Sequence, residues 1–165
     1  MAQSTNLPSD LQALIGSEMT GEPDHIESND IRFFAEAIRM PGPPLPAYHD
    51  ELHVRPNGSM GLLAPPTYMT RLARHGGYPW PLRLPPWLQG NVAMNAGAHL
   101  EINEPILAGD VIFTTARVAD IYEKVGSSGR LLFFVHDFHF TNQLGQDVGT
   151  ARRTTVKFRD RPTPP

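Results

Sequence analysis

Residues 104–156 read EPILAGDVIFTTARVADIYEKVGSSGRLLFFVHDFHFTNQLGQDVGTARRTTV, and this stretch decides the fold. Runs rich in β-branched and aromatic residues are typical of strands, and they occur here at 111–118, 130–142 and 148–158. Short turn-forming sequences separate these runs, at 108–110, 126–129 and 143–146. Together with a further strand near 98–103, the pattern predicts an antiparallel meander.

Two helical patterns precede the strands. Ser28 is suited to cap a helix through IRFFAEAIR, in which Ile31, Phe34 and Ile38 recur at helical spacing. Residues 65–77, PPTYMTRLARHGG, predict a second helix that begins at the prolines and stops at the glycines. The sequence therefore predicts an α+β protein in which a helix packs on an antiparallel sheet.

The composition is that of a single globular domain. The chain has 165 residues, 40% of them hydrophobic and 19% charged. A net charge of −3 gives no reason to expect nucleic acid or a membrane as a partner. No secretory signal or bilayer-length apolar run is visible, so we expect a soluble, cytoplasmic protein. We expect one domain at 9–159, with disordered ends at 1–8 and 160–165.

Two residue counts narrow the chemistry and the loops. The absence of cysteine excludes disulfides and thiolate chemistry. Seventeen prolines are present, about twice the average usage of roughly 5%. Because proline removes a backbone donor and fixes φ, the proline clusters at 41–46, 65–66 and 79–86 predict rigid loops.

Several short motifs, in their order and spacing, resemble the N-terminal hot-dog domain of MaoC-type and FAS1-like dehydratases. They are IRFFAEAI, PAYHDE, GLLAPPTYM, the EPILAGD turn and the TNQLG hairpin, and the likeness spans roughly residues 10–158. The resemblance implies a hot-dog fold, a curved antiparallel sheet wrapped around a central helix. It also implies hydration of 2-enoyl thioesters or dehydration of 3-hydroxyacyl thioesters, carried on coenzyme A or acyl carrier protein, without a cofactor.

The resemblance also shows which catalytic residues are missing. Active members carry an Asp-x-Asn-Pro-x-His loop whose carboxylate and imidazole hold one water, and a glycine N–H that binds the thioester oxygen. Here the histidine position falls at Tyr48 and the glycine position at Pro66. No Asp, Glu or Asn occurs between Glu36 and Asp50 to supply the carboxylate. We therefore expect a chain that lacks the family's acid–base pair.

Two-chain members of this family suggest what such a chain does. In them one hot-dog subunit keeps the acid–base pair and a degenerate partner shapes the acyl pocket. The resemblance thus implies a pocket-forming subunit in which Tyr48, Pro65 and Pro66 contact substrate. Because hot-dog domains pair sheet edge to sheet edge, we expect a homodimer or a heterodimer with a catalytic hot-dog subunit.

Two other functions remain open. In the first, the protein is a homodimeric enzyme that uses His49 with Asp50 or another carboxylate. Against this, AYHDELHV predicts a short helix with His49 and His53 on its solvated side. The same pair has metal-ligand spacing, but no further ligand is nearby in sequence, so we predict no metal site. In the second, the protein binds an acyl thioester or another apolar ligand without catalysis.

The remaining conspicuous residues have two interpretations each. Trp80 and Trp87 either cover an acyl chain or fill the core or an interface. Asn95 and His99 either line the cleft beside the central helix or serve turn chemistry. His136 shares a strand face with three phenylalanines, which favours a core or interface histidine over a catalytic one. Two adjacent arginines, at 152 and 153, either meet a coenzyme A phosphate or belong to a solvated face.

Overall fold

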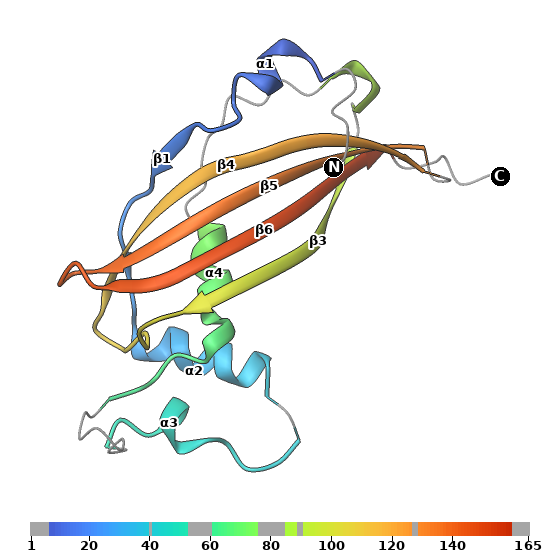
Figure 1. The fold of residues 1–165 in the computed structure, drawn as a ribbon. Helices are drawn as coiled ribbons and strands as arrows, with labels where there is room; N and C mark the ends of the chain where they lie inside the picture. The colour runs from blue at the N-terminus through green and yellow to red at the C-terminus, as the bar shows by residue number, and fades with distance from the viewer. Residues whose placement is uncertain are drawn as a thin grey trace.

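One curved antiparallel sheet dominates the structure, a computed structural model that describes residues 7–39, 41–52, 61–75, 85–88, 91–126 and 129–159. Its strands are β1 (Glu18–Thr20), β2 (Asp24–His25), β3 (Asn91–Ile102), β4 (Val111–Gly126), β5 (Gly129–Asn142) and β6 (Asp147–Arg159). The strand order is β1-β4-β5-β6-β3, and β2 also pairs with β4. The long strands curve around helix α4, which is the hot-dog arrangement (Figure 1).

The predicted meander is confirmed for its last three strands, whereas the strand predicted near 98–103 lies at the far edge beside β6 and not beside β4. β4, β5 and β6 pair in sequence, with Ala116 opposite Phe138 and Phe138 opposite Ala151. β3 begins at Asn91 instead of residue 98, because β6 extends to Arg159 and supplies a pairing partner along the whole length of β3. Asn95 therefore lies within β3, and its interpretation as a turn residue is wrong.

Short helices cover one face and the ends of the sheet. They are α1 (Ser9–Gln12), α2 (Ser28–Ala37), α3 (Pro46–His49), α4 (Met69–His75) and the 3₁₀ turns η1 (Pro66–Tyr68) and η2 (Pro86–Leu88). The prediction that Ser28 caps α2 is wrong, because α2 includes Ser28 and Glu27 takes the cap position without a side-chain hydrogen bond. No helix in the described part of the chain is long and apolar enough to cross a bilayer.

The main core lies between α4 and the inner face of the sheet. Tyr68, Met69 and Leu72 are almost completely buried, and they pack in one cluster with Phe138 and Phe140 of β5. Burying a side chain such as that of Leu72 stabilises a fold by roughly 1.5–3 kcal/mol. A second cluster, at the other end of the sheet, joins α1 and η2 to the strands.

Helix α2 is attached to the start of α4 by an aromatic and an ionic contact. The rings of Phe34 and Tyr68 meet edge to face, with their centroids 5.3 Å apart. Arg71 on α4 lies 3.1 Å from Asp30 and also donates a hydrogen bond to the Tyr68 hydroxyl. Burial raises the pKa of Tyr68, although the nearby Arg71 charge opposes the shift. The neutral phenol is therefore a fixed part of the α2–α4 contact.

Strands β3 and β6 approach each other closely at Gly149. The register of β5 against β6 shifts between the Phe140–Gly149 and Thr141–Asp147 pairs, which places a bulge at Val148. The N–H groups of Asn103 and Glu104 both donate to the Val148 carbonyl. Gly149 has φ +142°, and a Cβ built there would overlap the carbonyl oxygen of Glu101. The bulge thus fixes where β3 ends and the following turn begins.

Replacing Gly149 by alanine should destabilise the protein by about 2 kcal/mol or more, because it adds backbone strain and a backbone clash. Chemical unfolding followed by circular dichroism measures the change. The matched control is Gly126→Ala, since a Cβ at Gly126 meets nothing within 4 Å and the backbone there needs no positive φ. Equal stabilities for the two variants would show that the close approach at Gly149 is unimportant.

Candidate functional site

A cavity of about 290 Å³ opens where α3, the start of η1 and the end of β3 meet. Its lining residues come from segments far apart in the sequence and are Tyr48, Leu63, Ala64, Pro65, Pro66, Met69, Ile102, Asn103, Glu104, Pro105 and Ile106. Three of them, Tyr48, Pro65 and Pro66, are the residues expected to contact substrate. The fold therefore brings together the two positions, 48 and 66, that the resemblance pairs in catalysis.

Backbone hydrogen bonds hold the walls of this cavity in place. The Leu63 N–H donates to the Ala47 carbonyl at 2.8 Å, which ties the segment before η1 to α3. The Ala64 N–H donates to the Ile106 carbonyl at 2.9 Å, which ties the same segment to the turn after β3. Segment 62–64 is thus fixed from both sides, and Tyr48 is held beside Pro66 by main-chain contacts.

Few of the described residues that line the cavity have side chains that can transfer a proton. Pro66 is the first residue of η1, so this position offers no N–H to a thioester oxygen. Among the described lining residues, the ionisable side chains are the Tyr48 phenol and the Glu104 carboxylate, and neither is an imidazole. Sequence reasoning missed Glu104, although it lies in the EPILAGD turn that carries part of the resemblance. The cavity can bind a chain and accept or donate single hydrogen bonds.

His49 and Asp50 do not line this cavity. The His49 Nε2 lies 3.8 Å from Oε1 of Glu36 on α2, outside hydrogen-bond distance. The Asp50 Oδ1 accepts the Leu52 N–H at 2.9 Å, so this carboxylate stabilises its own turn. The predicted helix through AYHDELHV is wrong, since α3 ends at His49 and the backbone is extended at Asp50. His53 lies outside the described residues.

A second hollow, of about 390 Å³, follows the first along α4 and β3, and we call it the α4–β3 groove. It is lined by Thr70, Ala73, Ala93, Asn95, Ala98, Leu100, Ala151, Arg152 and Arg153. Asn95 therefore lies beside the central helix, where it was expected to line a cleft. A contact between Asn95 and substrate stays a prediction.

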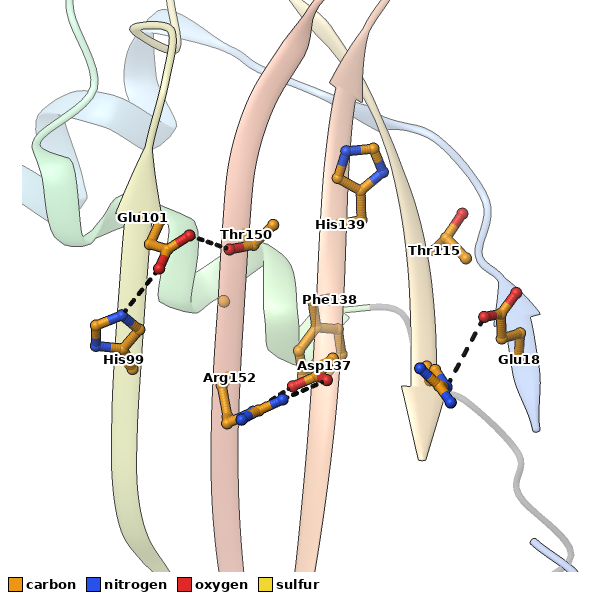
Figure 2. A pocket seen from close by; sticks show the side chains of 11 residues that line it. Glu18, His99, Glu101, Thr115, Asp137, Phe138, His139, Thr150 and Arg152 are labelled. Carbon is orange, nitrogen blue, oxygen red and sulfur yellow. Dashed lines mark hydrogen bonds and ion pairs between the residues drawn. The ribbon is translucent and has the colours of Figure 1, made fainter. Parts of the chain in front are cut away.

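His99 lies on the opposite face of the sheet, away from α4 (Figure 2). Neighbouring strand residues point to opposite faces, so His99 is turned outward while Ala98 lines the groove. The His99 Nε2 is 3.3 Å from Oε1 of Glu101, and both side chains are exposed. His99 therefore does not line the cleft beside the helix, contrary to that expectation.

The outer face carries a row of alternating charges across the sheet. Cross-strand register places Glu18, Arg117, Asp137 and Arg152 side by side on successive strands, and the uncharged or cationic His99 follows beside Arg152 outside the alternation. Arg152 donates two hydrogen bonds to Asp137, at 2.6 and 2.8 Å, and these hold the pKa of Asp137 below its usual value. The charges already satisfy one another, which favours a solvated face over a phosphate site for Arg152.

The roles of Trp80 and Trp87, as cover of an acyl chain or as core or interface residues, stay predictions. Trp80 lies outside the described residues. The backbone of Trp87 belongs to η2, but its side chain is outside the described part of the chain. The neighbouring Leu88 is fully buried in the second core cluster, so η2 itself packs on the sheet.

His136 and Arg153 lie side by side on the inner face. They are paired in register between β5 and β6, and the His136 ring lies among Phe134 and Phe138. This placement confirms that His136 shares a face with the phenylalanines. Burial, together with the positive charge of Arg153, lowers the pKa of His136, and Asp137 only partly opposes the shift. Neutral imidazole is therefore the stable form in the folded protein.

The lowered pKa of His136 predicts a pH-dependent stability. The unfolded chain binds a proton at His136 near pH 6.5 while the folded chain resists it, so the free energy of unfolding should fall as the pH drops from about 7 to about 5. Urea unfolding across this range measures the slope. His136→Gln should flatten the slope, and an identical slope in both proteins would contradict the prediction.

A family model described as the FAS1-like dehydratase domain region matches residues 13–151. No curated protein matches the sequence significantly. Among solved structures, the chain is similar to the C-terminally truncated HadBC (3R-hydroxyacyl-ACP dehydratase) complex of Mycobacterium tuberculosis, with a TM-score of 0.70 and 20% identity over 93% of this chain and 99% of that chain.

Two further structures share the fold at similar identity. The ChsH1–ChsH2 complex of Mycobacterium tuberculosis has a TM-score of 0.62 and 20% identity over 88% of this chain and 87% of that one. A MaoC-like dehydratase has a TM-score of 0.71 and 20% identity over 90% of this chain, which spans only 43% of that protein. With the family model covering most of its length, the chain belongs to the FAS1-like dehydratase domain region family, and it shares the hot-dog fold of these structures.

Proposed function

We propose that this chain is the pocket-forming, non-catalytic subunit of a two-component hydratase or dehydratase that acts on acyl thioesters. One observation carries the proposal: Tyr48 and Pro66, which the resemblance assigns to the histidine and glycine positions of active members, line the same cavity. Adding water to an enoyl thioester requires a base for the water and a donor for the thioester oxygen. A phenol and a proline supply neither function in the required form.

The free edge of the sheet at β3 favours binding of a partner subunit. β3 is an edge strand, and Val92, Met94 and Ile102 on it leave large apolar side chains exposed. An edge strand also presents unpaired backbone N–H and C=O groups, which another strand can bind. Ile102 also lines the cavity, so a subunit paired along β3 would lie next to the site. HadBC and ChsH1–ChsH2 are themselves described as complexes.

A second candidate function is catalysis by His49 with Glu36. The observation in its favour is their 3.8 Å approach between α3 and α2, which supplies a carboxylate that the sequence pattern lacks. Against it, Glu36 also contacts Arg39 at 3.2 Å, and Tyr48 instead of His49 lines the cavity. The third candidate, a ligand-binding protein without catalysis, needs only the cavity and the groove.

Purified alone, the protein should not hydrate short-, medium- or long-chain trans-2-enoyl-CoA esters above the uncatalysed rate, because its cavity lacks a water-activating pair. Activity should appear when a hot-dog subunit with an intact Asp-x-Asn-Pro-x-His loop is added. Loss of absorbance of the enoyl thioester follows the reaction. Turnover by the isolated chain would refute the proposal.

His49→Ala separates the first two candidates. The reconstituted complex should keep its activity with this variant, since His49 lies outside the cavity lining. An enzyme that relies on His49 and Glu36 would lose activity with the same change. A chain that is stabilised thermally by acyl-CoA esters but gives no turnover with any such subunit would instead favour the binding protein.

Met94→Lys should weaken subunit association by about tenfold or more, because pairing along β3 would bury a charge beside the interface. Val125→Lys is the matched control: Val125 is 76% exposed on β4, away from the free edge, and should tolerate lysine. Sedimentation velocity measures association, and circular dichroism confirms that both variants fold. Equal association of the two variants would exclude β3 as the pairing edge.

A further inference from the structure

We propose that the acyl group handled at this site carries an anionic, carboxylate-like substituent near its far end, which Arg153 receives in the α4–β3 groove together with Asn95 and Thr70. This inference rests on the proposed function, because it assumes that the thioester end lies at Tyr48 and Pro66. It adds the class of acyl chain, which neither the family nor the cavity alone specifies.

The cavity and the groove follow one another along the same two elements. On α4, Met69 lines the cavity, while Thr70 and Ala73 line the groove within the next turn. On β3, Ile102 lines the cavity and Leu100, two residues away on the same face, lines the groove. From Ile102 to Asn95 the strand covers roughly 23 Å at about 3.3 Å per residue. An extended chain that enters at Pro66 is therefore directed toward Asn95.

The groove combines space with polar groups. Four of the lining residues are alanines, at 73, 93, 98 and 151, and their small side chains leave space for a ligand. The Asn95 Oδ1 accepts the Gly97 N–H at 3.2 Å, which leaves the amide nitrogen to donate to a ligand. The Thr70 hydroxyl donates to the Thr67 carbonyl at 2.8 Å and can still accept a hydrogen bond. A purely aliphatic chain end would leave these groups without a complementary partner in the groove.

The charge in the groove is positive. None of its described lining residues is acidic, and its two arginines differ in direction. Arg152 turns to the outer face, where it binds Asp137, whereas Arg153 pairs in register with His136 on the inner face. A guanidinium has five N–H donors, so Arg153 can bind a carboxylate oxygen and keep its other contacts.

The test compares acyl-CoA esters of equal length that differ only at the far end. The pairs are sebacoyl-CoA with decanoyl-CoA, and hexadecanedioyl-CoA with palmitoyl-CoA. Isothermal titration of the full chain, alone and mixed with a catalytic hot-dog subunit, measures Kd. In at least one of the two pairs, we expect the carboxylated ester to bind about tenfold tighter than the plain ester of the same length, because a charge-assisted hydrogen bond contributes this much.

Arg153→Met should abolish this preference, while Arg117→Met should keep it, because Arg117 lies on the outer face and does not line the groove. Asn95→Leu is the second variant, and it should reduce the preference severalfold even if Arg153→Met does not fold. Equal binding of the paired esters, or a preference that survives both inner-face variants, would overturn the inference and leave the proposed function standing.

A different pattern would identify coenzyme A as the source of the anion. If Arg153→Met weakens plain and carboxylated esters equally, and weakens free coenzyme A as well, the arginine binds a phosphate and the inference is wrong. If no ester binds, either to the chain alone or to the mixture with the catalytic subunit, the proposed function fails together with the inference.

Discussion

The packing of α4 against the curved sheet is the contact on which the rest of the structure depends. The helix is only seven residues long, too short to be stable alone in water, so its conformation is maintained by burial of Met69 and Leu72 against Phe138 and Phe140. Once this contact forms, the start of α4 has a fixed place above the end of β3. The cavity and the groove follow one another along α4 and β3 beside that contact.

Pro66, at the start of η1, helps to form the cavity but cannot donate a backbone hydrogen bond to a ligand there. A helix start is where backbone N–H groups are free to bind an oxygen. Proline is well suited to that start because its φ is already helical, yet it has no N–H to give. The resemblance assigns Pro66 to the position of the donor glycine, and a proline at the start of η1 has no N–H to give. It assigns Tyr48 to the histidine position, and Tyr48 lines the same cavity as Pro66.

The two faces of the sheet use similar residues for different purposes. Arg152 and Arg153 are neighbours, but alternation along β6 sends one to a solvated row of ion pairs and the other to the concave groove. Exposed pairs such as Arg152–Asp137 contribute little to stability. Arg153 lies instead beside a histidine whose charged form is disfavoured, in surroundings partly removed from water. The inner face is therefore where specificity can be built.

The α+β class and the consecutive pairing of β4, β5 and β6 follow from the sequence, because β-branched and aromatic runs and turn residues act locally. The hot-dog family follows from the resemblance of its motifs, and the place of β3 beside β6 was decided by the tertiary structure. The expectation that the catalytic residues are missing also comes from the sequence, since the resemblance places Tyr48 and Pro66 at the histidine and glycine positions. Tertiary structure alone decided which side of the sheet each strand residue faces relative to α4: the β3 bulge shifts the register between Asn95 and Gly97, placing Asn95 in the groove and His99 outside it. It also decided that Glu104 and Tyr48 share one cavity and that His49 approaches Glu36, because these contacts join segments whose separation in sequence carries no information about their distance in space.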